Sequence, residues 1–300
     1  MSKAKIGYIG VGLMGHGAAK NILEKGHPLT VMGHRNRAPV EDLLKRGAKE
    51  AKSAAEIARG NDILFLCLPS SIEVEATVYG VGGVLEGAHA GLIVVDSTTA
   101  DPNSTRRIAE DLKKKGARML DAPLGRTPKE AEEGKLSTYV GGDDATFAAV
   151  KPVFDTYADT VIHVGPLGMG HTLKLINNFI SIGTCAVISE AAATAAKVGV
   201  DMRKFYEVIS AGGANSKMFQ MMMPWVLEGD DSHLKGPLRI AGKDMRFYTR
   251  LAEAAPAAAF IAQAVNQTLH LFNTRGHGDR FLPVLPGLIA DLNGAKIRDL

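Results

Sequence analysis

The sequence predicts an N-terminal α/β domain with a doubly wound sheet, followed by an all-α C-terminal domain and joined to it by a long helix. Three observations predict this architecture. The chain has 300 residues, which exceeds the usual size of one domain. Short apolar runs alternate with amphipathic stretches over residues 1–165, as in a parallel sheet covered by helices. Residues 166–300 show helical patterns alone. We therefore expect domains at 1–165 and 166–300.

The hydrophobic pattern places the elements of the first domain. The runs Ile63–Leu68 and Leu92–Val95 are continuously apolar rather than alternating, which is typical of parallel strands covered on both faces. We expect strands at Ile6–Gly10, Leu29–Met32, Ile63–Leu68, Leu92–Asp96, Met119–Asp121, Leu136–Val140 and Val161–Val164. We expect helices between them at Met14–Lys25, Val40–Arg46, Ala54–Ala58, Pro102–Lys115 and Ala145–Tyr157.

A long uninterrupted helical pattern opens the second domain. From residue 169 to residue 198 no proline occurs, and Gly170 and Gly183 are the only glycines. Thirty helical residues would span about 45 Å, so we expect this helix to bridge the two domains. Further helices are expected at Asp201–Ser210, Phe219–Leu227, Lys243–Glu253, Phe260–Asn273 and Pro283–Leu292.

The composition argues against several classes of protein. The net charge of +3 is the small difference between 35 basic and 32 acidic residues, which gives no strong field for nucleic acid or a membrane surface. Cys67 and Cys185 lie in apolar stretches without metal or redox spacing. The nine histidines form no metal-ligand motif. The N-terminus shows no signal-peptide core. We expect a cytoplasmic protein without metal, nucleic-acid or membrane partners.

The N-terminal glycine motif predicts a dinucleotide site. Gly10-Val-Gly12-Leu13-Met14-Gly15 follows the first expected strand and opens the first helix. Its glycines allow a tight turn, close approach of a pyrophosphate and close helix packing. The free N–H groups of the helix then favour phosphate. These residues, Leu13 and Met14 included, are therefore expected to bind NAD(P) in a Rossmann-type domain.

The residues after the second strand indicate which cofactor is preferred. An acidic residue there would bind the ribose hydroxyls of NAD, whereas basic residues accommodate the 2′-phosphate of NADP. The segment His34-Arg35-Asn36-Arg37 has no acid and two arginines, whose planar groups suit a phosphate. We expect these four residues at the adenosine end of the cofactor, with NADP preferred over NAD. The alternative is a solvated basic turn.

Polar residues gather where the expected strands end. Ligands of doubly wound sheets bind beyond the carboxyl ends of the strands. Those ends carry Leu68-Pro69, Asp96-Ser97-Thr98 and residues 121–127. Lys174 and Asn178 lie four residues apart in the long helix, so both project from one helical face. This pattern predicts that the chemistry takes place among these segments.

Together these motifs resemble the β-hydroxyacid dehydrogenase family, which includes the 3-hydroxyisobutyrate dehydrogenases. The resemblance covers essentially the whole chain. It rests on the glycine loop and on Leu68-Pro69, Asp96-Ser-Thr98, Asp121-Ala-Pro123, Lys174-Leu-Ile-Asn-Asn178 and Lys243-Asp244.

The resemblance implies roles for individual residues. It implies that Lys174 is the catalytic acid/base, that Asn178 helps to hold the substrate, and that Lys243 closes over the nicotinamide side. We expect Ser97 beside the substrate. Leu68, Pro69 and Thr98 are expected beside the cofactor. The chemistry agrees, because carbonyl reduction leaves an alkoxide, which a positioned ammonium can stabilise and protonate.

One segment departs from the usual family pattern. Most members have Ser-Gly-Gly where this chain has Gly125-Arg126-Thr127. This variant resembles the 3-sulfolactaldehyde reductases. An arginine offers two charge-assisted hydrogen bonds to an oxyanion, and a sulfonate presents three oxygens. We expect these three residues to bind the anionic end of the substrate, although Arg126 could equally serve a carboxylate.

The sequence thus predicts a reductase or dehydrogenase that moves a hydride between NAD(P) and a small anionic semialdehyde or 3-hydroxy acid, with 3-sulfolactaldehyde as one candidate. The alternative is a carboxylate-specific dehydrogenase of the 3-hydroxyisobutyrate, glycerate or 4-hydroxybutyrate type. A non-catalytic cofactor-binding scaffold would lack the lysine, and Lys174 is present. By the same resemblance we expect a homodimer or homotetramer.

Overall fold

The computed structural model describes residues 3–298. The chain divides into two compact units, Met1–Lys174 and Leu175–Leu300. The boundary lies inside the long helix, whereas the sequence pattern suggested one after residue 165. The difference arises because the start of this helix is hydrogen-bonded to the sheet, through backbone N–H groups of Gly168 and His171 that donate to Asp121.

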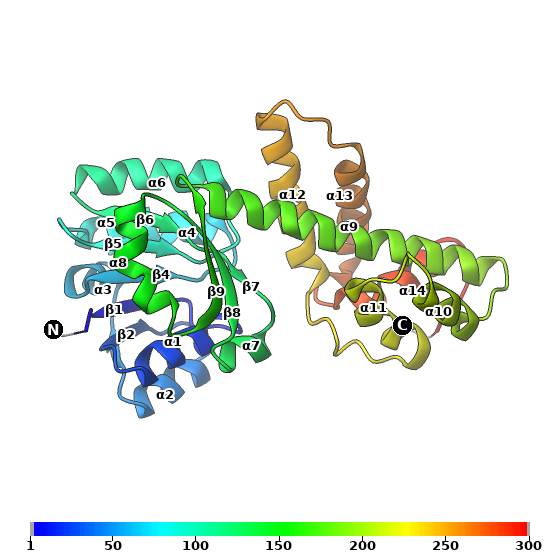
Figure 1. The fold of residues 1–300 in the computed structure, drawn as a ribbon, viewed down its shortest axis with the longest axis horizontal. Coiled ribbons are helices and arrows are strands. Elements are labelled where there is room, and N and C mark those ends of the chain that lie inside the picture. The colour runs from blue at the N-terminus through cyan, green and yellow to red at the C-terminus, as the bar shows by residue number, and fades with distance from the viewer. Residues whose placement is uncertain (1–2, 299–300) are drawn as a thin grey trace. The chain divides into compact units, whose positions relative to one another are not determined.

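The first unit contains one nine-stranded sheet (Figure 1). Its strand order is β3-β2-β1-β4-β5-β6-β8-β7, with β9 paired to β8. Strands β1 to β6 are parallel in this sheet, whereas β8 is antiparallel to β6 and β7. The strands are β1 Ile6–Ile9, β2 Leu29–Met32, β3 Lys49–Ala51, β4 Ile63–Leu66, β5 Ile93–Asp96, β6 Arg118–Asp121, β7 Leu124–Gly125, β8 Leu136–Gly141 and β9 Ala158–Gly165. The predicted α/β class is confirmed.

Helices cover both faces of this sheet. Ile6 and Tyr8 of β1 pack into one hydrophobic cluster, and Ile9 packs into the cluster on the other face. The continuously apolar strand runs follow from this double coverage. The helices are α1 Gly15–Glu24, α2 Ala38–Lys45, α3 Ala54–Gly60, α4 Ser71–Tyr79, α5 Val84–Gly87, α6 Pro102–Lys114, α7 Pro128–Glu132 and α8 Asp144–Phe154.

Side chains that accept backbone N–H groups mark several helix starts. Ser53, Ser70, Asp101 and Asp143 cap α3, α4, α6 and α8 in this way. Such caps satisfy donors that have no partner inside the helix. Of these, Ser70 and Asp101 fix the loops that follow β4 and β5, where predicted ligand residues lie.

The sequence pattern missed five short elements of this unit: β3, β7, α4, α5 and α7. Two of the three residues of β3 are exposed and charged, so no apolar run marks it. Helix α4 is rich in β-branched residues, which are poor helix formers. Strand β4 ends at Leu66 rather than Leu68, which leaves Cys67 and Leu68 in the loop.

The second unit is helical. Within its described residues, strand-type pairing is limited to one isolated bridge between Pro237 and Phe281. Its helices are α9 Met169–Lys197 (which begins in the first unit), α10 Met202–Ala211, α11 Lys217–Glu228, α12 Leu238–Ala254, α13 Phe260–Phe272 and α14 Leu285–Leu292. The long helix and the all-α character are confirmed. Helix α12 begins after Pro237, five residues before the predicted Lys243, so that Lys243 lies inside the helix.

Helix α9 is long and apolar enough to cross a membrane by length and composition alone. Half of its most apolar window is buried inside the fold. Burial of this kind is found in core helices of soluble proteins. Packing within the chain therefore accounts for half of this window.

Candidate active site

The glycine loop between β1 and α1 has the geometry of a phosphate cradle. Gly10 has φ +99°, and a Cβ on it would lie 2.1 Å from the carbonyl oxygen of Cys67. A side chain is therefore excluded there. At Gly12 a Cβ would have no neighbour within 4 Å, so the backbone faces open space. Leu13 is exposed, and α1 begins at Gly15. The cradle and the helix N-terminus fit a dinucleotide.

The segment after β2 presents one arginine to solvent and pairs the other. His34, Arg35, Asn36 and Arg37 are all exposed. Arg37 donates from both terminal nitrogens to Glu50 of β3, at 2.5 and 2.9 Å. This pair lowers the pKa of Glu50, chiefly through the hydrogen bond from Arg37. Arg35 forms no ion pair within residues 3–298. Arg35 is therefore the better placed of the two for a phosphate.

One hydrogen bond ties the loop after β4 to the loop after β5, and a second braces the loop after β5 itself. The Leu68 N–H donates to Thr98 Oγ1, and the Thr98 N–H donates to Asp96 Oδ1, each at 3.0 Å. Pro69 is exposed at this edge. Ser97 is 3% exposed, and its hydroxyl lies beside Tyr157. The structure thus brings Leu68, Pro69 and Thr98 together and leaves the Ser97 hydroxyl in the interior.

The Gly125-Arg126-Thr127 segment leads from β7 into α7. Arg126 has φ 74°, in the left-handed region, which costs a residue with a Cβ about 1–2 kcal/mol. Its guanidinium donates to Asp159 Oδ2 at 2.7 Å, to Thr160 Oγ1 at 3.1 Å and to the Lys135 carbonyl. Asp159 raises the pKa of Arg126, and Arg126 lowers that of Asp159.

Helix α7 connects this segment to the helix of the phosphate cradle. His16 Nδ1 lies 2.7 Å from Glu132 Oε1, and Lys20 Nζ lies 2.6 Å from Glu132 Oε2. His16 and Lys20 belong to α1, and Glu132 is the last residue of α7. Thr127 begins α7 through a capping box with Glu130. The segment is therefore anchored at both ends, beside the helix that starts at Gly15.

Lys174 and Asn178 lie four residues apart on α9, and both are half-buried. In the second unit, Asn178 Nδ2 donates to Asp244 Oδ2 at 2.7 Å. Lys243 Nζ lies 3.0 Å from Asp244 Oδ1, and its charge lies 5.6 Å from the centre of the Phe247 ring. The carboxylate of Asp244 thus orients the two predicted residues Asn178 and Lys243.

Sequence reasoning left several carboxylates of these networks without a role. Asp96, Asp121 and Asp244 stood inside the motifs, and each orients a neighbour through hydrogen bonds. Their positions after a strand, or beside a predicted ligand, were a usable signal. Glu50 and Asp159 gave no such signal. They meet Arg37 and Arg126 through folding alone, across 13 and 33 residues of chain.

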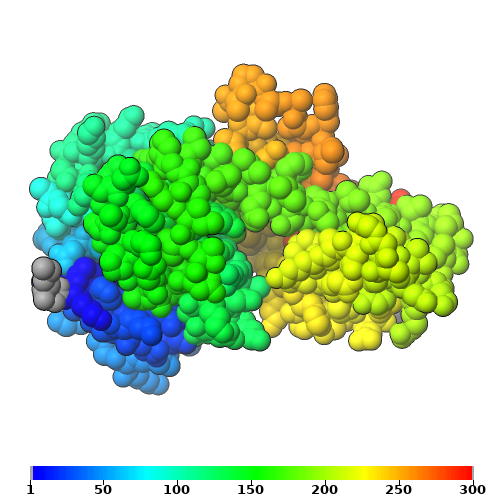
Figure 2. Space-filling model, in the orientation of Figure 1, coloured from blue at the N-terminus to red at the C-terminus, as the bar shows by residue number. Residues whose placement is uncertain are grey.

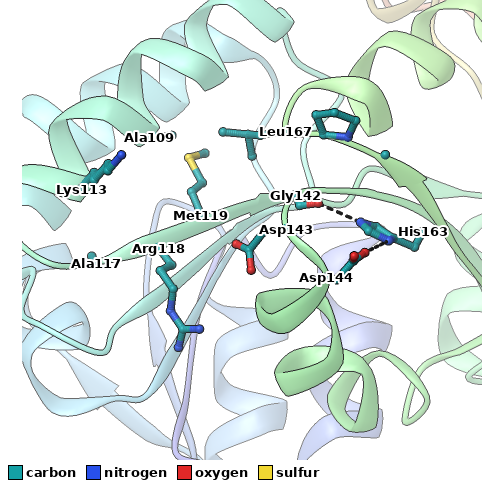
Figure 3. A pocket seen from close by; sticks show the side chains of 12 residues that line it. Ala109, Lys113, Ala117, Arg118, Met119, Gly142, Asp143, Asp144, His163 and Leu167 are labelled. Carbon is teal, nitrogen blue, oxygen red and sulfur yellow. Dashed lines mark hydrogen bonds and ion pairs between the residues drawn. The ribbon is translucent and has the colours of Figure 1, made fainter.

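A pocket of about 700 Å³ lies elsewhere in the first unit (Figure 3). It is lined by residues at the start of β6, among them Arg118, and by His163, which contacts the Gly142 carbonyl and Asp144. Its lining contains none of the site residues that the sequence predicts. In the described part of the chain, no group of three or more His, Cys, Asp or Glu side chains could hold a metal ion.

Two family models match the chain. Residues 5–165 match the NAD-binding domain of 6-phosphogluconate dehydrogenase. Residues 168–281 match the NAD-binding domain of NADP-dependent 3-hydroxyisobutyrate dehydrogenase. The two matches follow each other directly and cover most of the chain.

Individual relatives agree with these matches. The chain is 34% identical over 218 residues to a 2-hydroxy-3-oxopropionate reductase of Escherichia coli, covering 72% of this chain and 74% of the relative. It is 33% identical over 228 residues to a 3-sulfolactaldehyde reductase of the same organism, covering 76% of each. A 3-hydroxyisobutyrate dehydrogenase structure from Salmonella typhimurium superposes with TM-score 0.83 and 27% identity, over 95% of this chain and 99% of that one. Identity does not separate these substrates.

Proposed function

We propose a substrate class and catalytic roles for this chain, which belongs to the 3-hydroxyisobutyrate dehydrogenase-like β-hydroxyacid dehydrogenase family and is an NAD(P)-dependent oxidoreductase of CH–OH groups. The proposed substrate is a small semialdehyde, or its hydroxy acid, with an anionic end of sulfonate type such as that of 3-sulfolactaldehyde. Cofactor binding is assigned to the glycine loop, Leu68, Pro69, Thr98 and Lys243, with Arg35 at the adenosine end.

The chemical step needs a proton donor. When bound, the nicotinamide supplies or accepts the hydride. We assign the proton to Lys174 Nζ, because an ammonium can both stabilise a developing alkoxide and protonate it. We assign Asn178 to substrate binding, since Asp244 holds its amide in one orientation. An amide that is already oriented loses little further conformational entropy when it hydrogen-bonds the substrate.

The observation that carries the substrate class is the backbone of Arg126. A large cationic residue occupies a left-handed conformation at the end of β7, where glycine would be free of strain. Residues held in such conformations cluster at ligand-binding positions. Arg126 therefore places a strained backbone and a positive charge beyond the carboxyl end of a strand, where ligands of doubly wound sheets bind.

The ion pair with Asp159 sets a condition on this proposal. Arg126 donates to Asp159, Thr160 and the Lys135 carbonyl, so an anionic substrate must share the guanidinium or displace it from Asp159. Arg126 has five N–H donors. A tetrahedral sulfonate offers three acceptor oxygens and can use donors from more directions than a planar carboxylate. Thr127 is exposed beside Arg126, and its hydroxyl donates to Glu130 within the capping box, so an anionic substrate must also compete with Glu130 for that donor.

A substrate panel tests the proposed function. We expect NADPH oxidation with 3-sulfolactaldehyde at a higher kcat/KM than with matched carboxylates, including tartronate semialdehyde and methylmalonate semialdehyde. NADPH absorbance in initial-rate assays gives the comparison. A preference for carboxylates would remove the sulfonate assignment and favour the carboxylate-specific alternative. Absence of turnover on the whole panel, with NADPH still bound, would favour a cofactor-binding scaffold.

Cofactor preference gives a second test. We expect NADPH to be preferred, and Arg35→Ala to lower kcat/KM for NADPH about ten- to a hundredfold while changing that for NADH little, because a charged hydrogen bond to the 2′-phosphate is lost. Arg37→Ala is the matched control: Glu50 already holds that side chain, so a smaller change is expected. Equal kcat/KM with NADH in the wild type would show that the segment is a solvated basic turn.

We also propose that the protein is a homodimer or homotetramer. Five apolar residues of α9 remain exposed at spacings of three, four and seven: Met169, Leu173, Ile176, Ile180 and Val187. Figure 2 shows α9 uncovered over much of its length. A second copy of this chain would bury such a stripe. We propose, in addition, that the enzyme is cytoplasmic.

A further inference from the structure

A cluster of charged side chains is buried below the first turn of α9. Asp96 at the end of β5 is 1% exposed, and Asp121 at the end of β6 and His171 of α9 are both 0% exposed. His171 Nε2 lies 3.9 Å from Asp96 Oδ2, and its Nδ1 lies 3.9 Å from Asp121 Oδ2. Burial of ionisable groups is costly unless they are paired. The cluster therefore needs the imidazole between its two carboxylates.

On one side, the cluster fixes the start of α9. Asp121 accepts the backbone N–H groups of Gly168 and His171, each at 2.7 Å. These donors belong to the first turn, which has no intrahelical acceptors for them, and the carboxylate also suits the helix dipole. A Cβ on Gly170 would lie 2.2 Å from the Tyr139 carbonyl oxygen, so this turn lies directly on the sheet.

On the other side, the cluster reaches the cofactor loops. Asp96 Oδ1 accepts from the Thr98 N–H, and Thr98 Oγ1 accepts from the Leu68 N–H. Within residues 3–298, Asp96 Oδ2 and His171 Nε2 have no hydrogen-bond partner and face each other. His171 Nδ1 lies 2.8 Å from Thr105 Oγ1 of α6, which holds the ring in place.

We propose that His171 is a positioning residue, which joins the cofactor loops after β4 and β5 to the turn of α9 that carries Lys174. His171 and Lys174 are three residues apart on α9, so they lie about one turn apart on one side of the helix. Fixing this turn against Asp96 and Asp121 fixes the origin of the lysine side chain relative to Leu68 and Thr98. The proposal rests on the role of Lys174 proposed above.

The charges around His171 predict how the pH profile responds. The groups that face the ring are Asp96 on β5, Asp121 on β6 and the Thr105 hydroxyl on α6. Burial raises the pKa of Asp96, and the electrostatic interaction with His171 opposes this rise. Loss of the imidazole therefore raises the pKa of Asp96 further. Protonation of Asp96 weakens its charge-assisted bond to Thr98, so the acid limb of kcat moves to higher pH.

The test compares His171→Gln with the wild type in kcat, pH profile and NADPH affinity by fluorescence titration. We expect kcat to fall about ten- to a hundredfold, as for a small misplacement of a catalytic group. The acid limb should move to higher pH, and NADPH affinity should stay within about twofold. Thr105→Val keeps the ring and removes one partner, so a smaller loss of kcat with the same shift direction is expected. Thr105→Val also tests the proposal if His171→Gln fails to fold.

His163→Gln is the control, because His163 is a half-buried histidine of the same unit that contacts Gly142 and Asp144 rather than the buried carboxylates. It should leave kcat and the acid limb unchanged. The proposal is overturned if His171→Gln lowers the thermal midpoint but leaves kcat within about twofold and the acid limb unmoved, which is a purely structural role. Lys174→Ala, assayed in parallel, tells the two proposals apart. A Lys174→Ala defect beside a normal His171→Gln enzyme leaves the proposed function standing.

Discussion

Lys174→Ala is expected to lower kcat by about 10²–10⁴-fold and to leave NADPH affinity within about twofold, because the proton donor is lost while the cofactor cradle is untouched. Lys174 lies on α9, whereas the cradle lies between β1 and α1. Steady-state rates with a saturating semialdehyde measure the loss. Fluorescence titration with NADPH measures the affinity.

Two variants sharpen this result. Lys174→Arg keeps a positive charge, but a guanidinium does not give up its proton near neutral pH. It should therefore recover little of kcat if Lys174 transfers the proton, and much of it if charge alone matters. Lys197→Ala, at the other end of α9, should behave as the wild type. Near wild-type turnover of Lys174→Ala would remove the general-acid assignment and would favour a donor on another residue.

The long helix could be predicted because thirty residues without proline, and with only two glycines, are typical of one continuous helix. The first unit was predictable where strands are buried on both faces, as with β4 and β5, whose residues are apolar throughout. Strand β3 could not be predicted in this way. It is an edge strand with charged, exposed residues, and its pairing with β2 depends on the rest of the sheet.

The same distinction between local sequence pattern and long-range pairing applies to the candidate site. The glycine loop follows local rules of backbone conformation, so the sequence predicts its tight turn, and Gly10 has a positive φ there. The behaviour of the arginines depends on partners distant in sequence. Arg37 meets Glu50 only because β2 and β3 are adjacent, and Arg126 meets Asp159 only because β9 pairs with β8. Residue type thus predicts an anion site, whereas pairing decides whether an arginine lacks an ion pair within residues 3–298, as Arg35 does, or must be shared with a carboxylate, as Arg126 must be.

Arg126→Ala is expected to lower kcat/KM for the anionic semialdehyde about a hundredfold or more. The substrate would lose two charged hydrogen bonds, each worth about 1.5–3 kcal/mol, and about 1.4 kcal/mol corresponds to tenfold. Arg126→Lys should recover only part, because an ammonium lacks the planar fork. Initial rates on sulfonate and carboxylate semialdehydes, for the wild type and both variants, give the measurement. No change with either substrate would place specificity outside this segment.

The conformation of Arg126 supplies a control that separates recognition from strain. Arg126→Gly removes the guanidinium and also relieves the left-handed backbone at φ 74°, so its kcat/KM should match that of Arg126→Ala while its thermal midpoint is higher. Asp159→Asn keeps the arginine but withdraws the charge that holds it. If the substrate anion competes with Asp159 for the guanidinium, KM should fall severalfold in Asp159→Asn with kcat nearly unchanged. A rise in KM would instead mean that Asp159 presents Arg126 to the substrate, and the guanidinium would then bind both anions at once.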